Sequence, residues 1–187
     1  MRNERLRILV EIALCAALFV VLKYLKLLEM PSGGSVSLAM LPIIVIALLR
    51  GPVPGLVCGL LCGTISLLLG SDLYSAPQAL LDYPVTYLLV GLSGFLAPAF
   101  RAALDKSRTI TALAWILVAT AVGVLGRFVA SVLSGVLFFA QYAPEGQSPW
   151  LYSAGYNLSY LLPTGALTAV AAVIVIPILA RTILHKK

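Results

Sequence analysis

A carboxylate, Asp82, a proline and three further polar groups lie at residues 78–87, inside a segment that is otherwise apolar enough to span a bilayer. An ionised Asp at mid-bilayer depth costs about 2.5–3.5 kcal/mol, so it persists mainly where it faces other helices or a water-filled cavity. Helical spacing would place Gln78 and Thr86 on the same face as Asp82. Pro84 lacks a backbone donor and would leave a carbonyl near residue 80 unpaired. These features predict that Asp82 belongs to a binding site.

A second polar face follows from the spacing around Arg127. On a helix, Arg127, Ser131 and Ser134 would share one side, which could meet the face that carries Asp82. The alternative is a purely structural ion pair between Arg127 and Asp82, because buried charges are usually paired. Both interpretations stay open from the sequence.

The last apolar run begins with polar and aromatic residues and then becomes purely apolar. Tyr152 and Asn157 lie in its polar part. A single Tyr at this depth is more often an interfacial anchor than a ligand contact, so Asn157 is the better indicator of a site. One acid, one amide and several rings suit a small, flat, nitrogen-rich cation, because each ring face contributes about 0.5–2 kcal/mol and the acid supplies the counter-charge.

The elements that must position these groups are membrane helices. Of the 187 residues, 61 % are hydrophobic and only 11 % are charged, which excludes an ordinary soluble domain. The breaks between apolar runs are too short for a folded aqueous domain, so we expect one domain over residues 1–187. The first run is too long for a signal peptide.

The apolar runs predict an all-α protein with six transmembrane helices. The expected spans cover about 6–28, 36–49, 53–69, a fourth that ends near residue 100, 109–139 and 152–178. The fifth is too long for a straight crossing, which predicts tilt, a bend or an extension. Nearly all Lys and Arg lie on one side, with only Lys23 and Lys26 near the other, which predicts that both termini are cytoplasmic. No basic face remains for a nucleic acid despite the net charge of +6.

Small residues mark two packing faces. Ala13 and Ala17 form a face on the first helix that could pack internally or dock a second membrane protein. Glycines recur every fourth residue from Gly51 to Gly63, which predicts close approach of a neighbouring helix.

Enzymatic readings find little support in the sequence. Residues 91–94 match the short Gly-x-Ser-Gly motif of rhomboid proteases, but the only histidine, His185, lies in the terminal tail. There is no phosphate-binding loop for ATP hydrolysis. The cysteines, Cys15, Cys58 and Cys62, fall in apolar helices and behave there as small hydrophobes. We therefore expect no enzyme, no catalytic residue, no cofactor and no metal site.

The chain resembles the thiamine-specific substrate-binding (S) components of energy-coupling factor vitamin transporters over nearly its whole length. The matching motifs are Glu11 with Ala13, Ala16 and Ala17, residues 31–38, residues 41–43 with Arg50 and Gly51, Gln78 with Asp82 and Tyr83, residues 133–139, residues 141–146, and Tyr152 with Tyr156 and Asn157. Together these motifs are specific, although none is so alone.

The resemblance implies a subunit of a bacterial cell membrane that binds its vitamin from outside, under the first and fifth outer loops. It also implies assembly with a transmembrane coupling protein and two ATPases, with Ala13 and Ala17 against the coupling protein. Asp82, Tyr83, Tyr152 and Asn157 match ligand contacts of similar proteins, and Arg127 matches a basic residue close to the acid.

Some positions depart from the family pattern. Ser131 stands where some members have a pocket His, Phe139 where a stacking Trp occurs, and Asp82 where Glu is frequent. Glycines near Gly33 replace a first-loop Trp. The ligand is therefore expected to be thiamine or a related pyrimidine or thiazole, with Ser131 and Phe139 among the residues that bind it. The alternatives are a stand-alone facilitator or small channel, and a structural scaffold.

Overall fold

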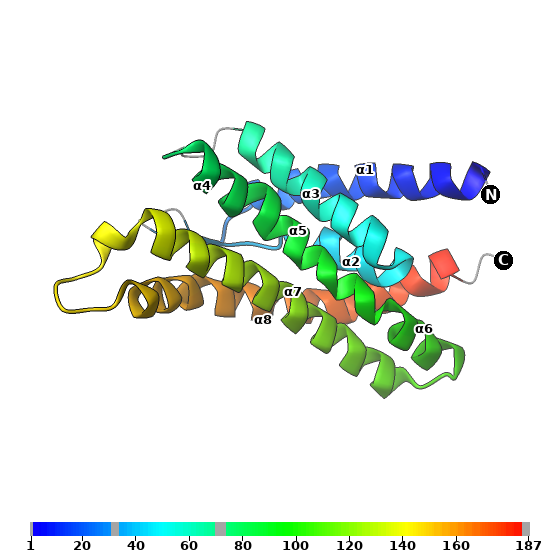
Figure 1. The fold of residues 1–187 in the computed structure, drawn as a ribbon. Helices are drawn as coiled ribbons and strands as arrows, with labels where there is room; N and C mark the ends of the chain where they lie inside the picture. Colours follow the sequence, from blue (N-terminus) through cyan, green and yellow to red (C-terminus); the bar gives the residue numbers. More distant parts are fainter. Residues whose placement is uncertain (1, 31–33, 70–73, 185–187) are drawn as a thin grey trace.

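The computed structural model describes residues 2–30, 34–69 and 74–184. The described residues form six helical rods (Figure 1). The first three are α1 (Arg2–Tyr24), α2 (Leu41–Arg50) and α3 (Pro52–Leu68); the fourth joins α4 (Ala76–Leu80), the π-helical η1 (Leu81–Val85), α5 (Thr86–Val90), the 3-10 helix η2 (Gly91–Leu96) and α6 (Ala97–Asp105); the last two are α7 (Thr109–Phe138) and α8 (Pro149–Leu184). A short 3-10 turn, η3 (Ala140–Tyr142), follows α7.

Three of these rods are long and apolar enough to cross a membrane, namely residues 76–105, α7 and α8. α2 and α3 are apolar but shorter. The expected all-α membrane protein is confirmed at this level. The start of α1 and the end of α8 lie at the same end of the bundle (Figure 1).

The second helix begins later than the sequence predicted. Ser35–Val36 is not helical but forms a strand, β2, which pairs antiparallel with β1 (Leu28–Glu29). The first predicted span is shortened for the same reason, because α1 ends at Tyr24. Pro42 therefore lies in the first turn of α2, where its missing N–H costs no hydrogen bond, and does not kink the helix interior.

The centre of the bundle is α2. Every residue from Leu41 to Leu49 is buried, because this short apolar helix packs against α1, α3, η2 and α8. At its end, Arg50 donates from Nε and Nη2 to the two carboxylate oxygens of Glu11, both at 2.6 Å. This bidentate ion pair fixes α1 against α2 near the chain termini.

The glycine face of α3 packs directly on backbone, as predicted. A Cβ at Gly59 would overlap the carbonyl of Tyr87, and one at Gly63 would overlap the carbonyl of Tyr83. The bare strip thus lets the rod that carries Asp82 lie against α3 without intervening side chains.

Candidate functional site

One cavity of about 560 Å³ lies at the end of the bundle opposite to the chain termini. It is enclosed by the end of α1, the segment around β2, the end of α3, η1 and α5, the second half of α7 and the first half of α8. A cavity of this volume is within the range of pockets that hold drug-sized ligands.

All the residues predicted to bind substrate line this one cavity. They are Asp82, Tyr83, Arg127, Ser131, Phe139, Tyr152 and Asn157. The structure thus brings together side chains from three rods, while their contact with a substrate stays a prediction. Gly33 lies outside the described residues, and its neighbour Gly34 lines the cavity.

The acidic wall is formed by a widened helical turn. Residues 81–85 form a π-helical turn around Pro84, and the hydroxyl of Thr86 donates to the carbonyl of Leu81 at 2.8 Å. Gln78 donates from Nε2 to the carboxylate of Asp82. The Gln78 side chain is itself fixed, because it forms a capping box with Ser75 at the start of α4. The carboxylate therefore has a defined position on the cavity wall.

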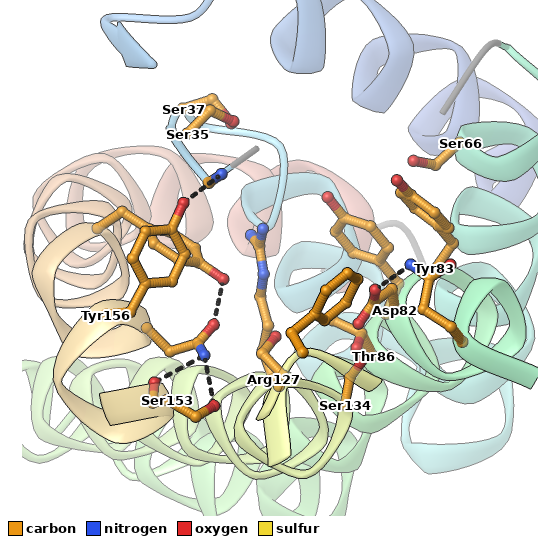
Figure 2. Close-up of a pocket in the computed structure, with 18 of the residues that line it drawn as sticks. Ser35, Ser37, Ser66, Asp82, Tyr83, Thr86, Arg127, Ser134, Ser153 and Tyr156 are labelled. Carbon is orange, nitrogen blue, oxygen red and sulfur yellow. Dashed lines mark hydrogen bonds between the residues drawn. The ribbon is translucent and has the colours of Figure 1, made fainter. Parts of the chain in front are cut away.

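Arg127 does not form the ion pair that was considered for it. No ion pair joins Arg127 and Asp82 among the described residues. The guanidinium instead lies 5.1 Å from the ring centroid of Tyr87 and 6.0 Å from that of Tyr160. Figure 2 shows the Arg127 side chain extending between the group around Asp82 and the group around Tyr156. The purely structural pair is therefore not supported, and Asp82 stays available to a ligand.

The opposite wall is a hydrogen-bonded network on α8. The Asn157 amide donates to the carbonyl of Ser153 at 2.9 Å and to its hydroxyl at 3.3 Å, and its oxygen accepts from the Tyr160 hydroxyl at 2.6 Å. Ser153 in turn donates to the carbonyl of Val132 on α7 at 3.0 Å. Tyr152 and Tyr160 line the cavity, so these tyrosines are not simply lipid-facing anchors.

The segment after the first helix closes one side of the cavity. The Gly34 amide donates to the hydroxyl of Tyr156 at 3.3 Å, and a Cβ at Gly34 would overlap the ring of Tyr160. Ser35 and Ser37 follow and also line the cavity. The part of the predicted covering loop at residues 31–33 lies outside the described residues.

Sequence reasoning missed Lys23 as a cavity residue. Its ammonium donates to the hydroxyl of Ser66 at 2.7 Å and lies 5.8 Å from the ring centroid of Tyr83. The signal was helical spacing, because Lys23 continues the side of α1 on which Ala16 and Phe19 are buried. A lysine in that register faces the bundle and not the lipid.

Comparisons with known proteins agree with this architecture. A family model described as "Thiamine transporter protein (Thia_YuaJ)" matches residues 9–186. The protein named Thiamine transporter ThiT of Bacillus subtilis is 36 % identical over 172 residues, covering 90 % of each chain. The protein of the same name from Lacticaseibacillus paracasei is 27 % identical over 189 residues, covering 99 % of this chain and 94 % of that one. A solved structure of ThiT from Listeria monocytogenes superposes with a TM-score of 0.86 at 30 % identity, covering 94 % of this chain and 96 % of that one.

Proposed function

Because the chain belongs to the thiamine transporter protein family, we propose that it is the membrane-embedded substrate-binding subunit of an energy-coupling factor transporter and captures thiamine in this cavity. It is a multi-pass membrane protein of a transporter family and not an enzyme. One observation carries the proposal: Asp82, Asn157 and several aromatic rings converge on one hollow within a membrane bundle.

Each wall of the cavity matches a part of the vitamin. Thiamine joins a positively charged thiazolium ring to an aminopyrimidine. The Asp82 carboxylate opposes the positive charge or accepts from the amino group, and Asn157 and Tyr152 hydrogen-bond to the pyrimidine. Phe139 and Tyr83 supply ring faces, while Ser131 and Arg127 complete the lining.

The orientation in the membrane belongs to the same proposal. Both termini lie in the cytoplasm of a bacterial cell and the cavity opens to the outside, within one domain over residues 1–187. The support is the concentration of Lys and Arg at the ends of the predicted spans, together with the position of the cavity away from the termini.

The partners also belong to the proposal. The chain has no ATP-binding loop of its own, so a transmembrane coupling protein and two ATPases would supply the energy. Ala13 and Ala17 are exposed on α1, whereas Ala16 between them is buried. This exposure supports docking of the coupling protein on the small-residue face, because internal packing does not use it.

Binding is tested by titrating the purified full-length protein with thiamine while following its intrinsic Trp and Tyr fluorescence. We expect saturable binding, and at least about tenfold weaker binding in Asp82→Asn, because the variant lacks the charge that opposes the ligand. Asp105→Asn, at the far end of α6, is the matched control and should bind like the parent.

Two outcomes would contradict the proposal. No saturable signal up to millimolar thiamine would exclude the cavity as its site. Thiamine flux into liposomes that contain this chain alone would favour a stand-alone facilitator or channel, because a binding subunit without its ATPases should bind and not transport.

A further inference from the structure

A second, smaller cavity lies between the turn that joins α6 to α7 and the last part of α8. Both segments are at the end of the bundle that carries the chain termini (Figure 1). The cavity has a volume of about 220 Å³ and is lined by Leu104, Ser107, Arg108, Thr109, Ala112, Leu113, Pro177 and Arg181. Pockets for drug-sized ligands measure about 300–1,000 Å³, so this one suits a smaller chemical group.

The second cavity is positively charged. Arg108 and Arg181 line it from two different helices, and none of the described residues that line it is acidic. Within the part of the chain that the structure describes, neither arginine forms an ion pair. Two guanidinium groups thus offer planar donors, which match the oxygens of a phosphate, without a counter-charge from the protein.

The start of α7 adds to this positive potential. Ser107 has a φ of 53°, and Arg108 takes the N-cap position of this 30-residue helix without any side-chain cap on the first turn. An uncapped first turn has N–H groups without intrahelical partners and carries the positive end of the helix dipole. Backbone donors and two arginines therefore favour an anion at the same place.

Apolar residues that face outward adjoin the charged residues of the cavity. On α7, Ile110 is 85 % exposed and lies three residues before Leu113, which lines the cavity. On α8, Ile178 is 62 % exposed and lies three residues before Arg181. Helical spacing puts the members of each pair on the same side of their helix. A site for a charged group thus lies next to surface that a lipid chain would cover.

We propose that Arg108 and Arg181 bind the phosphate group of an anionic phospholipid, with the start of α7 as a third contact. Basic pockets between transmembrane helices on the cytoplasmic side are typical sites for such headgroups. The acyl chains would lie along Ile110 and Ile178, an apolar contact that a soluble anion lacks. This inference needs only a chain embedded in a membrane and does not depend on the ligand of the larger cavity.

An acidic side chain of a partner protein is the other group that two arginines could meet. The proposed docking face lies on α1, which packs on α2 and α3, whereas α6, α7 and α8 form this cavity. Figure 1 shows α1 and the turn between α6 and α7 on opposite sides of the bundle. The position of the cavity therefore favours a lipid.

The test measures lipid binding to the purified full-length protein by native mass spectrometry, during titration of its detergent solution with phosphatidylglycerol or phosphatidylcholine. The parent should bind phosphatidylglycerol at least about fivefold more tightly, because choline neutralises the phosphate of the other lipid. Arg108→Gln and Arg181→Gln should each weaken phosphatidylglycerol binding about fivefold, and Arg181→Lys should retain most of it, since lysine also binds phosphate.

Lys106→Gln is the matched control, because Lys106 is an exposed cation of the same turn that does not line the cavity. This variant should bind both lipids like the parent. Equal weakening by Lys106→Gln and Arg108→Gln would show general attraction to a basic surface and overturn the site. Equal affinity of the parent for the two lipids would also overturn it.

Two further arms separate the lipid from the other anions. Thermal unfolding of the parent with millimolar inorganic phosphate should match unfolding without it, and stabilisation that disappears in Arg181→Gln would reassign the site to free phosphate. A double variant, Arg108→Gln with Arg181→Gln, should still co-purify with a tagged coupling protein. If it binds phosphatidylglycerol like the parent but no longer co-purifies, the cavity belongs to the assembly surface and the lipid assignment is wrong.

Discussion

Asn157 takes part in three hydrogen bonds of the cavity wall on α8. It is 5 % exposed, and both ends of its amide are engaged, one by Ser153 and the other by Tyr160. Such a side chain fixes the donors and acceptors around it in one arrangement, because each partner would otherwise be a buried polar group without a hydrogen bond. The wall is therefore ordered before a ligand arrives.

Replacement of this amide should damage stability and binding together. In Asn157→Leu, the Tyr160 hydroxyl loses its acceptor, and we expect a loss of about 1–3 kcal/mol in stability. Thiamine affinity should fall at least about tenfold. Thermal unfolding in detergent and fluorescence titration measure the two effects, and Ser159→Ala, on the exposed side of the same helix, should change neither. An unaltered affinity in Asn157→Leu would exclude this wall from the binding site.

At the scale of elements, the position of the acid depends on how α3 meets the rod that carries it. Gly59 and Gly63 present bare backbone to two carbonyls: that of Tyr87, just after the widened turn, and that of Tyr83, within it. Any side chain at these glycines must push that turn away from α3. The geometry of the acidic wall is therefore set by residues that do not line the cavity.

Gly59→Ala should displace the cavity wall that carries Asp82, although Gly59 itself does not line the cavity. We expect destabilisation of about 1–3 kcal/mol from overpacking, with weaker thiamine binding, because the added Cβ overlaps the carbonyl of Tyr87. Gly155→Ala on α8 is the control: a Cβ there meets nothing within 4 Å, and Ala favours a helix by roughly 1 kcal/mol over Gly. Thermal unfolding and titration of both variants check this. Equal behaviour of the two would show that the glycine strip has no positioning role.

For the whole molecule, the proposed docking face on α1 lies apart from the proposed binding cavity. Ala13 and Ala17 are exposed and lie away from the cavity. Ala13→Leu with Ala17→Leu should abolish co-purification with a tagged coupling protein and leave thiamine affinity within about twofold of the parent, since only the docking face gains bulk. Ala114→Leu, on an exposed face of α7, should preserve assembly. If the double variant still co-purifies with the coupling protein, the docking surface does not include Ala13 and Ala17.

The sequence was most informative about features that follow from the membrane environment, namely where apolar helices occur and which buried charges need a reason to be there. Apolar runs predicted the helical rods, and the cost of a charge in lipid singled out Asp82 and Arg127, which do line the same cavity. The sequence was least informative about helix ends and side-chain partners, because contacts between distant segments determine them. The pairing of residues 28–29 with 35–36 shortens α1 and delays α2, and no local pattern announces it. Within the part of the chain that the structure describes, Arg127 has no ion pair and lies instead against two rings from other rods, which its own sequence neighbourhood does not predict.

The two anchor points of α1 have a mechanical consequence. Glu11 is bound to Arg50 near the middle of this helix, and Lys23 is bound to Ser66 near its end. Ala13 and Ala17 lie on α1 between these two contacts, so both sides of this segment are fixed to neighbouring helices. If a partner docks on this part of α1 as proposed, these two contacts would pass its force to both α2 and α3, so that the rim of the cavity would move together with α1.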